Sequence, residues 1–280
     1  MTTTSTSQLS STVHANGIDI HYVEIGAGPP LVLLHGGLVT TNPLWAPTPV
    51  AYQAHLTELA RHFHVFAPDQ RGSGRTLHSG GPITMSLVAD DVLAFSQALG
   101  LDRPLVCGFS EGALTATIMA IRHPGSTRAV VADAGYDCLD PGAPVFTMGR
   151  ALLGGSPDAT RADPEAAETN FGSDPGMRAV FELMKADQDE GQGPGHWRTY
   201  LSTTFDRWTT WPGYGFADLA GIEVPTLVLV GDRDDFCTVE QGCQTYRSLP
   251  LGELAVLPDT GHEITAEKIG ILTEFLRRQG

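Results

Sequence analysis

A serine in a glycine-flanked pentapeptide is the first residue of this sequence that could do chemistry. Ser110 is the centre of Gly-Phe-Ser-Glu-Gly at residues 108–112, directly after the apolar run 105–107 and before a helix-forming stretch at 113–120. Strand, G-x-S-x-G and helix predict a turn so tight that the serine hydroxyl stands clear of the backbone. A Cβ at either glycine would collide with the neighbouring strand or helix. The pattern favours a nucleophilic serine.

A serine hydroxyl is a poor nucleophile until a base takes its proton, and a suitable base follows in the sequence. His262 comes just after the short apolar run 255–257. Asp234 completes a G-x-x-D pattern that begins at Gly231, after the apolar run 227–230. In this arrangement His262 would act as general base and then as general acid, and Asp234 would hold the imidazole in the correct tautomer.

Three other aspartates compete with Asp234 for the role of the acid. Asp232 and Asp235 follow the same apolar run, and Asp133 ends the preceding one. Asp234 is favoured by its spacing from Gly231, because adjacent positions of the same turn aim their side chains elsewhere. Asp133 remains the alternative candidate for the acid.

The tetrahedral oxyanion of acyl transfer needs two backbone donors. The N–H of Glu111, at the start of a helix, is one candidate, and the N–H of Gly37 is the second, with Leu38 as the alternative to Gly37. We expect His35 to support this loop rather than to act on substrate. The Glu111 side chain has two interpretations: a solvated carboxylate favoured by the helix dipole, or a negative group that discourages anionic acyl groups.

The elements that must position these residues alternate between strand and helix. A hairpin is indicated at Asn16-Gly17. Buried strands are indicated by uniformly apolar runs, and a helix over 85–99 by apolar residues at helical spacing. The strand runs lie at 31–34, 65–67, 105–109, 129–132 and 227–230, with a shorter one at 255–257 before a closing helix over about 263–278. This order predicts an α/β fold with a mainly parallel sheet covered by helices on both faces.

The alternation stops between residues 136 and 222. This stretch contains helical pieces at 177–188 and 196–205 and three tryptophans, Trp197, Trp208 and Trp211. Because it is too long for a loop, we interpret it as a helical cap inserted after the sixth strand. The predicted organisation is a flexible tail at 1–11, a core at 12–135 and 223–280, and the cap at 136–222. Most of the tryptophans would pack the cap, and one or two would line an apolar pocket.

Four motifs in order give the chain a family resemblance. They are His35-Gly36-Gly37, the G-x-S-x-G at 108–112, the G-x-x-D at 231–234 and Gly261-His262. With the segment 69–76, similar to the D-x-R-G-x-G-x-S/T turn of many members, they make the chain resemble capped α/β-hydrolases over nearly its whole length. The serine at 110 disfavours the epoxide hydrolases and haloalkane dehalogenases, which place aspartate there.

The resemblance implies a cofactor-free serine hydrolase, without metal, that cleaves a neutral, fairly apolar carboxylic ester or lactone through an acyl-enzyme. Peptidase activity of the proline-iminopeptidase type, C–C bond hydrolysis and perhydrolase chemistry use the same triad and stay open. Glu111 does not match the usual G-x-S-W-G of the iminopeptidases. A non-enzymatic sensor that binds a small ligand in a capped pocket is the alternative of a different class.

The amino-acid composition restricts the classes of partner that the protein is expected to bind. The 280 residues hold 17 basic and 32 acidic side chains, a formal charge of −15, which argues against nucleic acid and anionic membranes. No stretch approaches the roughly 20 apolar residues that span a bilayer. Four cysteines without C-x-x-C spacing and a start without a secretory signal favour a reduced, cytoplasmic protein. The expected partner is a small-molecule substrate; the oligomeric state is left open.

Overall fold

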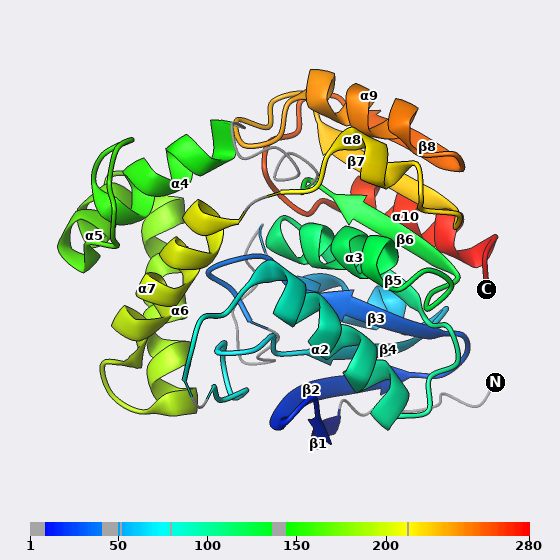
Figure 1. Ribbon diagram of the computed structural model, residues 1–280, viewed down its shortest axis with the longest axis horizontal. Coiled ribbons are helices and arrows are strands. Elements are labelled where there is room, and N and C mark those ends of the chain that lie inside the picture. Colours follow the sequence, from blue (N-terminus) through cyan, green and yellow to red (C-terminus); the bar gives the residue numbers. More distant parts are fainter. Residues whose placement is uncertain (1–8, 41–49, 51, 79, 136–143, 212) are drawn as a thin grey trace.

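The computed structural model describes residues 9–40, 50, 52–78, 80–135, 144–211 and 213–280 (Figure 1). Residues 1–8 of the predicted tail and 136–143 of the predicted cap, including Cys138, lie outside the described residues. None of the helices in the described ranges is long and apolar enough to cross a membrane.

The described strands form one eight-stranded sheet in the order β1-β2-β4-β3-β5-β6-β7-β8. The antiparallel pairs are β1 with β2 and β2 with β4, and the remaining pairs are parallel. The strands are β1 (Leu9–Ala15), β2 (Ile18–Gly26), β3 (Pro30–Leu34), β4 (His64–Pro68), β5 (Leu105–Phe109), β6 (Ala129–Asp133), β7 (Thr226–Gly231) and β8 (Gly252–Leu257). The predicted fold class, a mainly parallel sheet of the α/β type, is confirmed.

The hairpin predicted at Asn16-Gly17 joins β1 to β2, and both residues have positive φ, 46° and 77°. β1 begins at Leu9, which pairs with Glu24, so residues 9–11 of the predicted tail are part of the sheet.

Helices cover both faces of the sheet. The helices of the described residues are η1 (Tyr52–His55), α1 (Leu56–Leu59), α2 (Met85–Ala98), α3 (Glu111–Arg122), α4 (Pro144–Gly154), α5 (Pro164–Gly172), α6 (Pro175–Gln192), α7 (His196–Thr210), α8 (Phe216–Leu219), α9 (Val239–Ser248) and α10 (Ala266–Arg277). Figure 1 shows α2 and α3 in front of the sheet and α10 behind it.

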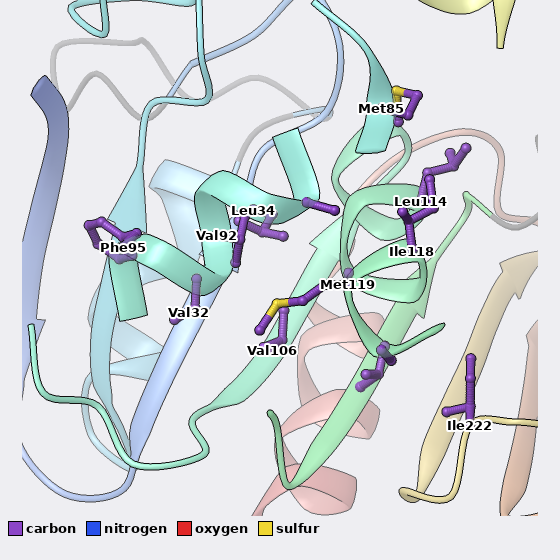
Figure 2. Packing of buried hydrophobic residues seen from close by; sticks show 14 of the residues in the cluster. Val32, Leu34, Met85, Val92, Phe95, Val106, Leu114, Ile118, Met119 and Ile222 are labelled. Carbon is purple, nitrogen blue, oxygen red and sulfur yellow. The ribbon is translucent and has the colours of Figure 1, made fainter. Parts of the chain in front are cut away.

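Alternate residues of each central strand enter two different apolar clusters, as the period of a strand requires. In β3, Val32 and Leu34 pack with α2 and α3, whereas Leu31 and Leu33 pack with α1 and α10. Figure 2 shows the first cluster, in which Phe95 and other α2 side chains meet α3 and the strands. Because both faces are covered, the central strands are uniformly apolar.

Between β6 and β7, helices α4 to α7 form a separate group beside one end of the sheet (Figure 1). We call α4–α7 the inserted helices. They share a third apolar cluster that contains Phe171, Phe181 and Trp197, in which the two phenylalanine rings stack with centroids 4.8 Å apart. Further along the chain, Leu219 and Ile222 pack in the first cluster, so residues of the predicted cap after α7 contact the core.

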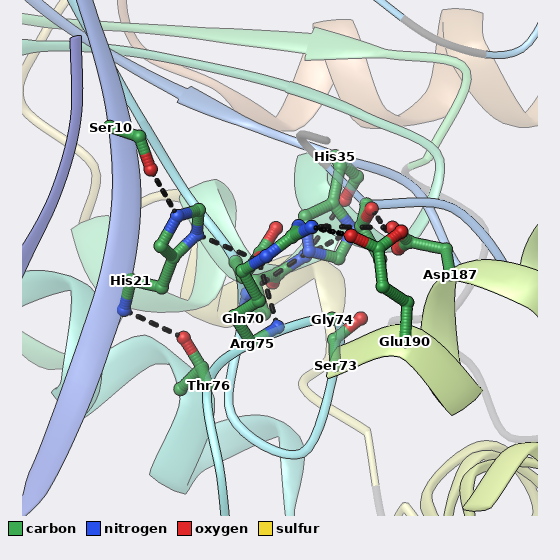
Figure 3. A network of polar contacts seen from close by, with 12 residues as sticks. Ser10, His21, His35, Gln70, Ser73, Gly74, Arg75, Thr76, Asp187 and Glu190 are labelled. Carbon is green, nitrogen blue, oxygen red and sulfur yellow. Dashed lines mark hydrogen bonds and ion pairs between the residues drawn. The ribbon is translucent and has the colours of Figure 1, made fainter. Parts of the chain in front are cut away.

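Helix α6 is joined to the turn that follows β4. The Gly74 N–H donates to Gln188 at 3.2 Å, and Arg75 forms an ion pair with Glu190 at 2.7 Å (Figure 3). At Gly191 a Cβ would collide with the Gly74 carbonyl, so the two backbones approach as closely as only glycine permits. The D-Q-R-G-S-G-R segment at 69–75 therefore packs against α6 and holds it in place.

Candidate active site

The turn at Ser110 has the geometry that the pentapeptide predicts. Ser110 lies between β5 and α3 with φ 52° and ψ −119°, a conformation that side chains rarely adopt. A Cβ on Gly108 would collide with the Gly112 carbonyl, and one on Gly112 would collide with the Leu34 carbonyl. The Ser110 N–H donates to the Asp133 carbonyl at 2.8 Å, which fixes the turn to the end of β6.

Ser110, His262 and Asp234 come together from three separate segments of the chain. His262 Nε2 lies 3.1 Å from Ser110 Oγ, and His262 Nδ1 lies 2.9 Å from an Asp234 carboxylate oxygen. The Asp234 side chain is fully buried, and the imidazole is 18% exposed. This is the connectivity that a serine nucleophile, a base and an orienting acid require.

The loops after β7 and β8 hold the acid against the imidazole. The Arg233 N–H donates to the Thr260 carbonyl at 2.9 Å, and a Cβ on Gly231 would collide with that same carbonyl. Asp234 Oδ1 accepts hydrogen bonds from the N–H groups of Phe236 and Cys237, each at 2.9 Å. These bonds hold the Asp234 carboxylate in place independently of His262.

The rival aspartates face elsewhere. Asp133 is buried and forms an ion pair with the equally buried Lys268 of α10 at 2.7 Å. Burial raises the pKa of Asp133, and the Lys268 ammonium opposes that rise. Asp232 and Asp235 are exposed. The geometry therefore favours Asp234, and Asp133 instead joins the end of β6 to the helix that follows His262.

Two aromatic rings flank the imidazole. The centroids of Phe109 and Phe236 lie 4.9 Å and 4.8 Å from that of His262. These contacts restrict the ring to the plane in which it meets both Ser110 and Asp234.

One of the candidate oxyanion donors is already engaged. The Leu38 N–H donates to the Tyr200 hydroxyl of α7 at 3.1 Å. This bond leaves Gly37 and Glu111 as the pair of backbone donors to propose. A Cβ on Gly37 would lie 2.5 Å from the Trp208 ring, so only glycine fits beneath that indole.

His35 supports this loop, as expected. Its Nδ1 lies 2.7 Å from the Gly36 carbonyl, and its Nε2 accepts a hydrogen bond from the Gln70 N–H at 3.0 Å. Burial lowers the pKa of His35, which favours the neutral ring that this pair of bonds requires. Asp69 accepts a hydrogen bond from the Arg75 N–H and contacts His21. It therefore stabilises the turn that packs against α6 (Figure 3).

The Glu111 side chain is not solvated, contrary to one of the two interpretations of the sequence. It is 6% exposed and forms an ion pair with Arg207 of α7 at 2.7 Å. The Trp208 indole N–H donates to its other carboxylate oxygen. The interpretation as a free negative group also changes, because a guanidinium compensates the charge.

A cavity of about 310 Å³ opens at Ser110 and His262 between the sheet and the inserted helices. Its apolar walls come from both parts of the chain: Met85, Phe109, Leu114 and Phe236 from the core, and Leu152, Phe171, Met177, Val180 and Trp208 from the inserted helices. Trp211, directly after α7, also lines the cavity and packs in the first cluster. Trp197 packs within the inserted helices instead. The volume is at the lower end of that usual for small-molecule sites.

A family profile described as the alpha/beta hydrolase fold matches residues 29–268. The chain belongs to the α/β-hydrolase family. As a member of this family the protein is a hydrolase. The matched region contains Ser110, Asp234 and His262.

The names of relatives of this α/β-hydrolase indicate hydrolysis of different kinds of bond. It is 25% identical to a 2-hydroxy-6-oxo-2,4-heptadienoate hydrolase from Pseudomonas putida, over 96% of each chain. It is 30% identical to a protein assigned as the carbamate hydrolase RutD from Caulobacter sp. (strain K31), over 44% of this chain and 46% of that protein.

Among solved structures, the enol-lactonase from Burkholderia xenovorans LB400 is similar, with a TM-score of 0.70 and 22% identity over 95% of this chain and 98% of that chain. The carboxylesterase CesB from Bacillus subtilis has a TM-score of 0.71 and 15% identity, over 98% and 91%. At these identities the likeness concerns the fold.

The described residues of the hydrolase bring one set of possible metal ligands together. Asp234, Cys237 and His262 place their ligand atoms within 4.8 Å of one another. Two of the three are the hydrogen-bonded acid and base, so a cation there would compete with the Asp234–His262 bond. The Cys237 thiol donates to the Ala134 carbonyl at 3.0 Å.

The sequence interpretation missed several residues of this site. Arg207, Tyr200, Lys268 and the ring contact of Phe236 were not singled out. Arg207 pairs with a residue 96 positions away, and Lys268 with one 135 positions away, so no local pattern signals either pair.

Proposed function

We propose that this protein is a serine hydrolase that cleaves a neutral, fairly apolar carboxylic ester or lactone through an acyl-enzyme on Ser110. The observation that carries the proposal is the 3.1 Å approach of His262 Nε2 to Ser110 Oγ at the floor of an apolar cavity. The inserted helices act as a cap that supplies the outer wall. The cytoplasmic location expected from the cysteine spacing stays a prediction.

In the first half of the reaction, Ser110 Oγ attacks the carbonyl carbon while His262 Nε2 takes the hydroxyl proton. The N–H groups of Gly37 and Glu111 stabilise the oxyanion of the tetrahedral intermediate. When the C–O bond breaks, the leaving alkoxide takes the proton from His262, and the acyl group stays on Ser110.

In the second half, His262 takes a proton from a water molecule that attacks the acyl carbon. The second tetrahedral intermediate collapses, the carboxylic acid leaves, and Ser110 regains its proton from His262. Asp234 stabilises the imidazolium in both halves.

The test is a panel of p-nitrophenyl esters and lactones of increasing chain length. We expect Ser110→Ala to lower kcat by roughly 10⁴-fold or more with the fold intact, since triad members act as a unit. Unchanged circular dichroism and thermal midpoint serve as the control. A variant that keeps a tenth of the wild-type rate would remove Ser110 from the mechanism.

Adding a prolyl amide, a vinylogous diketone and hydrogen peroxide to this panel separates the alternatives. A proline-iminopeptidase-like enzyme would prefer prolyl amides, a C–C bond hydrolase would prefer a vinylogous diketone, and a perhydrolase would need peroxide. A ligand sensor would give no rapid release of p-nitrophenol from p-nitrophenyl acetate.

A further inference from the structure

The cavity wall next to the nucleophile contains a buried ion pair. Glu111 Oε1 lies 2.7 Å from Arg207 Nη2, and the two side chains are 6% and 4% exposed. Glu111 belongs to α3, directly after Ser110, whereas Arg207 belongs to α7 of the inserted helices. Both residues line the cavity.

Most of the described residues that line the cavity are apolar. Apart from His262, Glu111 and Arg207 are the ionisable side chains among them. Among the described residues, Glu111 is the carboxylate that forms an ion pair with Arg207. Burial lowers the pKa of His35 and raises that of Tyr200, so both groups are neutral at pH 7. Glu111 is therefore the counter-charge of Arg207 in this wall.

Arg207 also has an unused donor. Its Nε is buried and has no hydrogen-bond partner among the described residues, while Nη2 contacts Glu111 and, at 3.4 Å, Thr204. A guanidinium binds a carboxylate through parallel N–H bonds, and a buried guanidinium without a counter-charge is strongly unfavourable. Removing the Glu111 carboxylate would leave a cationic site that an anion can satisfy.

We propose that Glu111 determines substrate charge specificity by masking Arg207. In the wild-type protein the pair is neutral as a unit, so the cavity accepts neutral acyl groups and gives a terminal carboxylate no partner. Without the Glu111 carboxylate, Arg207 becomes a subsite for the carboxylate of a dicarboxylic acid monoester. This inference rests on the proposed ester hydrolysis.

The experiment compares two esters with the same six-carbon acyl chain, ethyl hexanoate and monoethyl adipate, in a pH-stat at fixed ionic strength. We expect Glu111→Gln and Glu111→Ala to raise the ratio of kcat/KM for monoethyl adipate to that for ethyl hexanoate by about tenfold or more. Two substitutions are used so that the result does not depend on one variant folding. Alanine is the best helix former for this position in α3.

Two controls isolate Arg207. The double variant Glu111→Gln with Arg207→Met removes both charges, and its ratio should return to the wild-type value. Glu253→Gln breaks the exposed Glu253–Arg278 pair of the same 2.7 Å length, which is not part of the described cavity lining, and should leave the ratio unchanged. A ratio that stays at the wild-type value in folded single variants, or a rise that persists in the double variant, would overturn the inference.

Calorimetry separates this outcome from failure of the proposed function. If the wild type hydrolyses no ester, the function proposed above is wrong, but binding of adipate to Glu111→Ala and not to wild type would still support the masked subsite. Equal binding of adipate to both proteins would reject it.

Discussion

Asp133 ends β6 and Asp234 follows the adjacent β7, and the orientation of each side chain decides its role. Asp234 meets His262 at 2.9 Å, whereas Asp133 meets Lys268 at 2.7 Å. An acid that orients the imidazole affects the rate, and an acid in a buried ion pair affects stability. The two residues should therefore give different phenotypes on the same conservative change.

We expect Asp234→Asn to lower kcat by about 10⁴-fold, as an amide does in the serine-protease template, where it leaves the histidine in the wrong tautomer. Asp133→Asn should keep most of the activity per folded molecule but lower the free energy of unfolding by about 3 kcal/mol, because Lys268 loses its partner. Steady-state kinetics and urea denaturation measure the two effects. The exposed Asp232→Asn is the matched control and should change neither. An inactive Asp133→Asn with a healthy Asp234→Asn would reverse the assignment.

At the scale of elements, four inserted helices and the sheet share the walls of one cavity. Val180 of α6 and Leu152 of α4 lie on walls remote from Ser110's own strand and helix. Remote walls contribute binding that is similar in ground and transition states, so they should set chain-length preference more than turnover of a small ester.

We expect Val180→Phe, which adds bulk to the cavity wall, to lower kcat/KM for p-nitrophenyl octanoate by roughly tenfold and that for p-nitrophenyl acetate by less than about twofold. Ala179→Phe is the control, because Ala179 is on the exposed side of the same helix. Identical selectivity of wild type and Val180→Phe across the esters would mean that α6 does not contact the acyl chain.

At the scale of the whole molecule, stability depends on a histidine that must stay neutral. The His35 Nε2 accepts from Gln70, and protonation of Nε2 would replace that acceptor with a second donor. Burial lowers the pKa of His35 below its ordinary value of 6.5. In the window between the folded and unfolded pKa values, the unfolded chain binds more protons, so stability falls as the pH falls below about 6.5.

We expect this contribution to reach at most about 1.4 kcal/mol per pH unit, the limit for one proton. His35→Gln keeps an acceptor near the Gln70 N–H and cannot titrate, so its unfolding free energy should fall less between pH 7 and pH 5 than that of wild type. Urea denaturation at several pH values measures the difference. The exposed His14→Gln should follow the wild-type curve, and parallel curves for wild type and His35→Gln would contradict the assignment.

Local pattern was sufficient for much of this protein. The G-x-S-x-G turn, the apolar strands and the Asn16-Gly17 hairpin each depend on neighbouring residues, so the sequence predicted the fold class and proposed Ser110, Asp234 and His262. The glycines at 108 and 112 were explained by contacts with adjacent elements, and the structure has those contacts. The observed ends of the elements differ from the predicted ends by a few residues. Helix α10, for example, begins at Ala266 rather than near residue 263, because Thr265 caps its N-terminus.

Tertiary structure alone decided the partners that lie far apart in the chain. It assigned Asp133 to Lys268, the Leu38 N–H to Tyr200, and Glu111 to Arg207 rather than to solvent. Sequence periodicity reports which face of one element is apolar, but not which residue of a distant helix packs against it. Those choices follow from how α7 contacts the loop after β3 and the start of α3, and how α10 packs beside β7. Burial there leaves each polar group only the partner that the packing brings within reach.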